Sequence, residues 1–123
     1  MTSELRKITF DQTEVQAALV NHCLRSKIYI PDANIDKITL HDTAEGAAVL
    51  YFTVSNPADP HEVTLNRDNL AAALIRYAMD QGIPLPRIGQ KILAIKDGAV
   101  SLMINIHTII RKQDPSVSAD LQA

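Results

Sequence analysis

The sequence predicts an α+β domain built from a tandem duplication of a β-α-β-β unit. Shifting residues 7–42 by 55 positions lays them over residues 62–97 without a gap, and a shift three residues shorter continues the match to residue 106. The identical pairs include Thr9/Thr64, Ala17/Ala72, Ala18/Ala73, Leu19/Leu74, Ile28/Ile83, Pro31/Pro86, Asp42/Asp97 and Gly46/Gly98. Helix and strand signals recur at the same spacing. We therefore predict a largely antiparallel six-stranded sheet with two helices on one face and pseudo-twofold symmetry.

Local signals define the elements of the first copy. Asp11 and Glu14 have the spacing of a capping box, and an apolar stripe at three- and four-residue steps follows them. Alternating apolar residues then indicate strands. The predicted elements are a strand over residues 7–10, a helix over 12–26, and strands over 35–42 and 47–55. The polar residues 1–6 are expected to be frayed.

The second copy repeats this plan. Asn66 is a good helix N-cap, Gly82 suits the left-handed residue that ends many helices, and Asp97-Gly98 is typical of a tight hairpin turn. Lys27 stands where the second copy has Gly82, so the first helix is expected to end differently. The predicted elements are a strand over residues 62–65, a helix over 67–81, and strands over 90–96 and 99–110.

The two copies are expected to share one domain. Repeat 1 covers about residues 7–55 and repeat 2 about residues 62–110, and the short linker leaves no room for independent movement. We assign residues 1–113 to this single domain. Residues 114–123 have no apolar pattern and are expected to form a disordered tail.

Composition restricts the classes of function. The chain of 123 residues has 46% hydrophobic and 21% charged residues and a net charge of −2, which is typical of a soluble globular protein without a polyanion partner. No apolar run is long enough to span a bilayer, and no signal-peptide pattern is present. We expect a cytoplasmic protein that binds neither nucleic acid nor membrane. The single cysteine, Cys23, falls among apolar helix residues and is interpreted as a core residue.

No catalytic constellation is recognisable. The four histidines lack the spacing of a zinc site, and the sequence contains no CxxC, HExxH, GxGxxG, Walker or GxSxG motif. We predict no catalytic residue, no metal and no cofactor, and a binding function is favoured over an enzymatic one. Basic residues near the second hairpin lack the interleaved aromatics that would favour nucleic acid.

The leading hypothesis is a small protein-interaction or regulatory module that forms a homodimer. The sheet face opposite the helices carries apolar residues among polar ones, which is a pattern found at subunit interfaces. The interface residues predicted on this face are Val49, Tyr51, Met103 and His107. A solvent-exposed face with scattered apolar residues is the alternative interpretation.

A second hypothesis is a small-ligand-binding protein, or a divergent enzyme, with a groove between the repeats. The two proline corners align, so a pseudo-twofold axis could bring them to one groove. The predicted ligand-binding residues are His22, Tyr77, Tyr29 and Arg87. For His22 and Tyr77, the competing interpretation is a half-buried side chain with a hydrogen bond at its polar tip.

Overall fold

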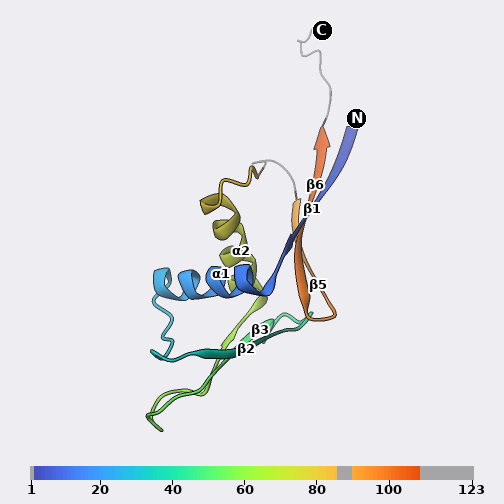
Figure 1. Cartoon of the computed structure of the whole chain (residues 1–123). Helices are drawn as coiled ribbons and strands as arrows, with labels where there is room; N and C mark the ends of the chain where they lie inside the picture. The colour runs from blue at the N-terminus through green and yellow to red at the C-terminus, as the bar shows by residue number, and fades with distance from the viewer. Residues whose placement is uncertain (1, 86–89, 109–123) are drawn as a thin grey trace.

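The fold is an α+β arrangement of two helices and two three-stranded antiparallel sheets (Figure 1). The computed structural model describes residues 2–85 and 90–108. In chain order the elements are β1 (Thr2–Phe10), α1 (Gln12–Arg25), β2 (Ile35–Leu40), β3 (Ala48–Phe52), β4 (Glu62–Leu65), α2 (Arg67–Asp80), β5 (Gln90–Lys96) and β6 (Ala99–Thr108). The α+β class and the order of elements predicted from the sequence are confirmed.

The prediction of one six-stranded sheet is wrong. One sheet has the order β1-β6-β5 and the other has the order β2-β3-β4. The first strand of each half therefore pairs with the hairpin of the other half, β1 with β6 and β4 with β3. Apolar alternation marks a segment as a strand but does not name its partner, so the pattern is the same for one sheet or two.

Corresponding strands of the two halves pair in the same register, except that the β2–β3 ladder has a register shift between Ile35 and Lys37. Phe10 lies opposite Val100 in one sheet, and Leu65 lies opposite Ala48 in the other. The two hairpins agree as well, with Ile38 opposite Leu50 and Leu93 opposite Leu102. Because directly paired residues share a face of a sheet, corresponding side chains point the same way in both sheets.

β1 is longer than the sequence predicts. Thr2 pairs with Thr108, so residues 2–6 belong to the strand and are not frayed. The cause is long-range, since β6 supplies the hydrogen-bonding partner that polar residues near a terminus would otherwise lack. Together β1 and β6 extend beyond the end of β5 (Figure 1). The predicted end of the last strand and the predicted tail lie outside the described residues.

The two helices begin in the same way. Both have 14 residues, and the side chains of the N-caps Asp11 and Asn66 accept hydrogen bonds from the amides of Glu14 and Asn69. The predicted capping box is confirmed, because the Glu14 carboxylate also accepts a hydrogen bond from the Asp11 amide. A single residue, the N-cap, thus separates each helix from the strand that precedes it.

The two helices also end in the same way, which corrects the expectation for the first one. Lys27 has φ 57° and Gly82 has φ 75°, both left-handed. In each case the next amide closes the helix, Ile28 donating to the Cys23 carbonyl and Ile83 to the Ala78 carbonyl at 2.9 Å. This hydrogen bond offsets the cost of the left-handed conformation at Lys27.

Replacing Lys27 with glycine is therefore expected to stabilise the protein. Glycine adopts the left-handed conformation without the clash of a Cβ atom but loses more chain entropy on folding, so Lys27→Gly should raise the free energy of unfolding by about 0.5–1 kcal/mol. The matched variant, Gly82→Lys, should lower it by about 1 kcal/mol. Urea unfolding followed by circular dichroism measures both. A loss of stability in Lys27→Gly would contradict the argument.

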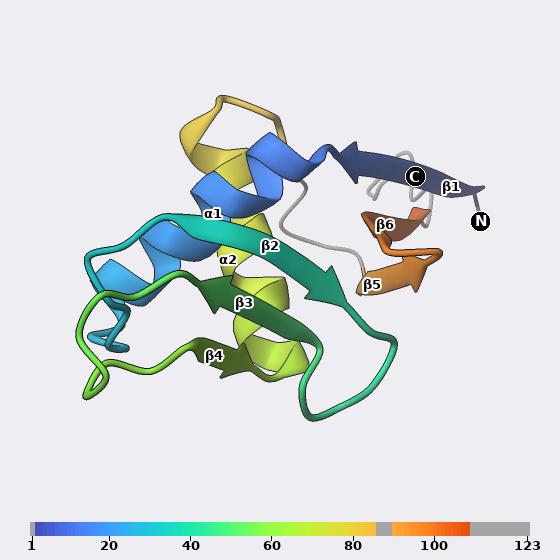
Figure 2. The same ribbon diagram turned by 60° about the horizontal axis from the view of Figure 1, so that its bottom comes forward.

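The helices and both sheets enclose one hydrophobic core. Both helices lie behind the β2-β3-β4 sheet in Figure 2, with the other sheet to one side, so the helices fill the angle between the sheets. Leu19 and Leu74 of the helices and Leu50 and Leu102 of the sheets are at most 1% exposed. Cys23 is buried in the same cluster, as predicted, and burial raises the pKa of its thiol. Among the described residues, no helix has the length and apolar character required to cross a membrane.

Candidate functional site

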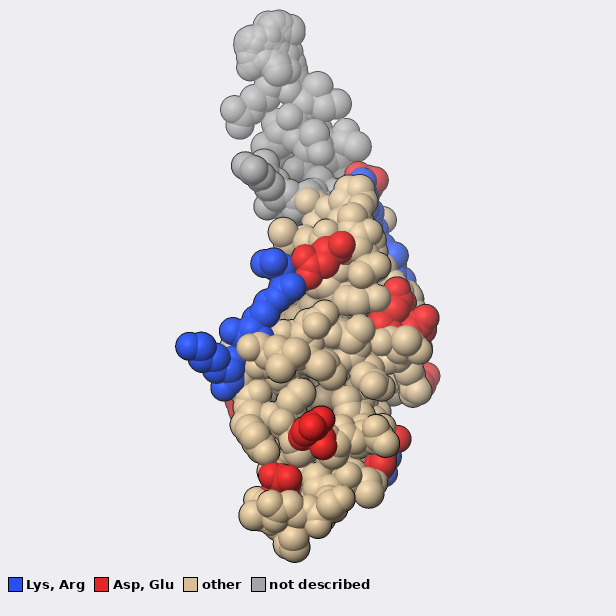
Figure 3. Space-filling model, turned by 60° about the vertical axis from the view of Figure 1, so that its left-hand side comes forward, with Lys and Arg blue, Asp and Glu red and all other residues tan. Residues whose placement is uncertain are grey.

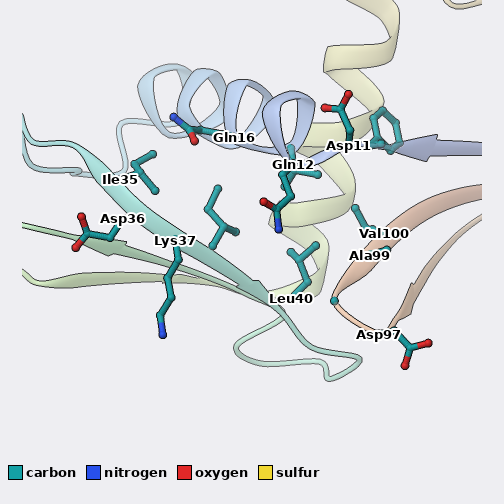
Figure 4. Close-up of a pocket in the computed structure, with 14 residues that line it drawn as sticks. Asp11, Gln12, Gln16, Ile35, Asp36, Lys37, Leu40, Asp97, Ala99 and Val100 are labelled. Carbon is teal, nitrogen blue, oxygen red and sulfur yellow. The ribbon is translucent and has the colours of Figure 1, made fainter.

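A cavity of about 350 Å³ lies between the first turn of α1, the free edge of β2 and the β5–β6 turn (Figure 4). We call it the β2 cavity. It is lined by Phe10, Asp11, Gln12, Val15, Gln16, Ile35, Asp36, Lys37, Ile38, Leu40, Asp97, Gly98, Ala99 and Val100. Its volume falls in the range of pockets that hold small ligands or side chains of a partner. Residues of both halves line it, so neither half forms it alone.

The lining of the β2 cavity combines an apolar wall with polar residues. Phe10, Val15 and Val100 are buried. Gln12 points into the space, and Asp97 stands at the rim on the β5–β6 turn with its carboxylate turned outward (Figure 4). Asp97 has no ion pair or hydrogen-bonded partner within the described part of the chain.

The two charged residues of β2 in the lining are directed away from the cavity (Figure 4). Asp36 accepts a hydrogen bond from the Thr53 hydroxyl. The Lys37 ammonium lies 4.8 Å from the centre of the Tyr51 ring, where it forms a cation–π contact. These partners hold both side chains toward the other face of the sheet.

The backbone of β2 presents hydrogen-bonding groups beside the cavity. β2 is an edge strand, and His41 donates its amide to the Ala47 carbonyl just beyond its end. Pairs in an antiparallel ladder alternate between hydrogen-bonded and non-hydrogen-bonded, so Leu40 and Ile38 occupy non-hydrogen-bonded positions. Their amides and carbonyls therefore face outward, away from β3.

In the second half, Arg67 occupies the place that corresponds to the β2 cavity, between the start of α2, the β2–β3 turn and the edge of β5. Its Nη1 donates to Asp42 Oδ1 at 2.8 Å, and its Nη2 donates to the outward carbonyl of Leu93 on the edge of β5. Its backbone amide donates to the Ala44 carbonyl at 2.9 Å. One guanidinium thus joins the start of α2, the β2–β3 turn and the free edge of β5.

Two sequence differences leave the β2 cavity open. Gln12 aligns with Arg67, and its shorter amide makes no hydrogen bond to another described residue. The Asp97-Gly98 turn is three residues shorter than the turn that carries Asp42 in the first half. No counterpart of Ala44 is therefore present to accept a hydrogen bond from the Gln12 amide.

Replacing Arg67 with glutamine is expected to destabilise the protein. Arg67→Gln removes two hydrogen bonds from a charged group that is only 32% exposed, so the free energy of unfolding should fall by about 1–3 kcal/mol. Arg76→Gln is the control. The Arg76–Asp80 pair is a surface ion pair on one helix, so its loss should cost about 0.5 kcal/mol or less. Equal effects in thermal unfolding would show that Arg67 has no special role.

Two of the four predicted ligand residues come together, but in a space too small for a ligand. His22 and Tyr77 line a gap of about 20 Å³ between the helices, which is enough for roughly one water molecule. His22 Nε2 lies 2.8 Å from Asn69 Oδ1, and the Tyr77 ring packs edge-on against Phe10 with centroids 6.4 Å apart. The His22 contact supports the interpretation of a half-buried side chain bonded at its polar tip, whereas the contact of Tyr77 is made by its ring.

The other two predicted ligand residues do not join them. Tyr29 is 63% exposed and donates its hydroxyl to Asp59 at 2.9 Å, and this hydrogen bond raises the pKa of Tyr29. Asp59 belongs to a separate hollow of about 460 Å³, formed mostly by polar loop residues between positions 32 and 59. Arg87 lies outside the described residues.

An ion-pair network links the C-terminal ends of α1 and α2. Asp80 accepts hydrogen bonds from Arg25 at 2.8 Å and from Arg76 at 3.1 Å. These two guanidinium groups, with Arg25 contributing most, hold the pKa of Asp80 below its usual value. All three side chains are exposed, so the network contributes little to stability.

The predicted interface residues lie on two different sheets. Val49 and Tyr51 are on β3, and Met103 is on β6. The side chain of His107 lies outside the described residues. Since the strands form two sheets, these residues do not share the single face expected from the sequence.

Charge is unevenly distributed on the surface. On the face in Figure 3, lysine and arginine side chains form a short row at one edge and a strip along the opposite edge, and acidic residues are scattered over an uncharged surface. This face has no broad basic area of the kind that binds nucleic acid. The described residues contain no group of three or more histidine, cysteine or acidic side chains placed to hold a metal ion.

Comparison of the chain with protein-family models, curated proteins and solved structures found no significant match. Sequence reasoning did not single out Gln12 and Asp97, which line the β2 cavity. The signal was present in the alignment of the two halves, where Gln12 replaces Arg67 at a helix start. Its meaning depends on the neighbours of Arg67, which the sequence does not show.

Proposed function

We propose that the protein is a small non-enzymatic binding module that holds an extended segment of a protein partner at the β2 cavity. One observation carries this proposal. The cavity opens beside the free edge of β2, where outward amides and carbonyls at Ile38 and Leu40 are available. Many proteins bind a peptide by adding it as a strand to an exposed sheet edge, with its side chains in adjacent pockets.

The exposure of the β2 edge supports the proposal. Exposed edge strands favour association with other chains, and proteins commonly protect them. The corresponding edge of β5 is partly covered, because Arg67 bonds to the Leu93 carbonyl. On β2, the register shift between Ile35 and Lys37 interrupts one end, and the remaining edge lies over the cavity. A partner segment would therefore find both backbone groups and a pocket at one place.

Photocrosslinking in cells of the native host tests the proposal. A benzophenone amino acid introduced at Gln16, which is exposed and lines the β2 cavity, should form a defined adduct with one partner protein. The same group at Thr13 is the matched control, because Thr13 is exposed on the same helix but does not line the cavity. Mass spectrometry of gel-separated adducts identifies the partner.

A defined adduct from Gln16 that is weak or absent from Thr13 supports binding at the β2 cavity. Equal labelling from both positions would show contact with the helix surface in general. No adduct from Gln16 would overturn the proposal for a protein partner. Circular dichroism of each labelled protein verifies that it is folded.

Self-association is a second candidate function, favoured by exposed apolar residues on the β1-β6-β5 sheet. Leu5 is 63% exposed and Ile92 is 45% exposed. Leu5 pairs with Asn105 and Ile92 pairs with Met103, so all four share one face of that sheet. Of the residues predicted for a homodimer interface, Met103 belongs to this surface.

Light scattering at micromolar concentration tests self-association. The unmodified protein is expected to be a dimer, and the double variant Leu5→Glu with Ile92→Glu a monomer, because paired subunits would bury the introduced charges. Leu24→Glu is the control, since Leu24 is 66% exposed on α1 and should leave the dimer intact. A monomeric unmodified protein would refute this candidate.

We further propose that the two halves arose by tandem duplication and are related by a pseudo-twofold axis. The common register of corresponding strands, the equal lengths of the helices and their matching ends support it. A cytoplasmic location is also proposed, and the single free thiol, Cys23, buried in the core, supports it.

A further inference from the structure

We infer that the β2 cavity recognises a guanidinium group, supplied by an arginine side chain of the partner segment. This inference rests on the proposed function, because it names the chemistry of the segment that binds at the cavity. The reason lies within the chain itself. In the other half, the corresponding place is filled by the guanidinium of Arg67.

The acceptors that Arg67 uses have counterparts around the β2 cavity. Asp97 aligns with Asp42, and both stand on the hairpin turn that faces the start of a helix. Ile38 holds the register position of Leu93, whose carbonyl accepts from Arg67, so the Ile38 carbonyl also faces outward beside the cavity. A carboxylate and a carbonyl thus stand at corresponding positions of the chain, with the Asp97 carboxylate turned outward (Figure 4).

The occupant differs between the halves. Arg67 starts α2 and reaches its acceptors from within the chain, whereas Gln12 starts α1 and reaches none among the described residues. An arginine from outside would place its guanidinium at these acceptors. Phe10 and Val15 would contact its aliphatic stem, since they form the apolar wall. A rotation of the outward-turned Asp97 side chain would complete the contact.

The local charge favours a cation. The carboxylate of Asp97 has no partner in the described part of the chain, and the one basic side chain of the lining, Lys37, is held over Tyr51. The positive end of the α1 dipole opposes a cation, but Asp11 and Glu14 carry negative charge there and cap its amides. Arg67 occupies the same position relative to α2, so the dipole does not exclude a guanidinium.

A guanidinium fits these acceptors better than an ammonium. Its donors lie in a fixed planar fork, which can bond a carboxylate on one side and a carbonyl on the other. Arg67 uses two different nitrogens for these two acceptors. Lysine offers a single strongly hydrated nitrogen and should bind less well.

An NMR titration of the isotope-labelled full chain tests the inference. The probe is N-acetyl-arginine methylamide, and the uncharged isostere is the corresponding citrulline compound. The arginine probe should shift the amide signals of Gln12, Ile38 and Gly98, whereas the citrulline and lysine compounds should shift them at least about tenfold less at equal concentration. Agmatine, which lacks the flanking peptide groups, identifies a site for a free small molecule if it binds and the arginine probe does not.

Two asparagine variants distinguish the cavity from nonspecific charge. Asp97→Asn should weaken binding of the arginine probe about tenfold, because it removes the carboxylate. The substitution suits the turn, since Asp97 has φ 54° and asparagine tolerates this conformation. Asp42→Asn removes the matching carboxylate in the other half and should leave binding unchanged. Unchanged binding in Asp97→Asn, or equal shifts with citrulline, would overturn the inference.

Filling the cavity from within is an independent measurement. Gln12→Arg should raise the melting temperature and abolish binding of the arginine probe. The introduced guanidinium would fill the β2 cavity as Arg67 fills the corresponding place in the other half. The gain in melting temperature should disappear when Asp97→Asn is added. No gain in Gln12→Arg would contradict the geometry. If crosslinking from Gln16 succeeds and the arginine probe fails, only the guanidinium chemistry is wrong; if the probe binds and no adduct forms, the protein partner is wrong.

Discussion

The pairing of each half's first strand with the other half's hairpin is the constraint on which the rest of the structure depends. β1 pairs with β6 along nine residue pairs, and β4 pairs with β3 along four. Only the N-cap residue separates each helix from such a strand, so the first turn of the helix lies beside the hairpin turn of the other half. The cross-pairing also places both helices in the angle between the sheets, where one core buries their apolar stripes (Figure 2).

The two halves differ at the start of the helix. Arg67 fills the space beside the edge of β5, whereas a cavity lies beside the edge of β2. Helix ends agree in conformation and most strand pairs agree in register, so the differences lie in a few side chains, in the length of one turn and in the register shift of β2 between Ile35 and Lys37. Arg67 closes its side by bonding Asp42 and the Leu93 carbonyl. On the other side, the short side chain of Gln12 and the shorter Asp97-Gly98 turn leave the β2 cavity open.

The interface between the helices contains His22 and Tyr77, two of the residues predicted from the sequence to bind a ligand. His22 and Tyr77 do face each other's helix, as an alignment of the two halves suggests, and the tip of His22 contacts Asn69. Side chains with an apolar body and a polar tip have the same composition in a core as in a ligand site. Only the volume left between them, about 20 Å³, distinguishes the two.

The sequence by itself determined the elements and their caps. Local hydrogen-bonding preferences and hydrophobic periodicity were sufficient for the capping box of Asp11, the left-handed Gly82 and the Asp97-Gly98 turn. The tertiary structure alone decided that the strands form two sheets, that Lys27 ends its helix as Gly82 does, and that a cavity lies beside β2. These features depend on which distant segments meet, and that choice comes from packing of the whole chain, not from the pattern of any single segment.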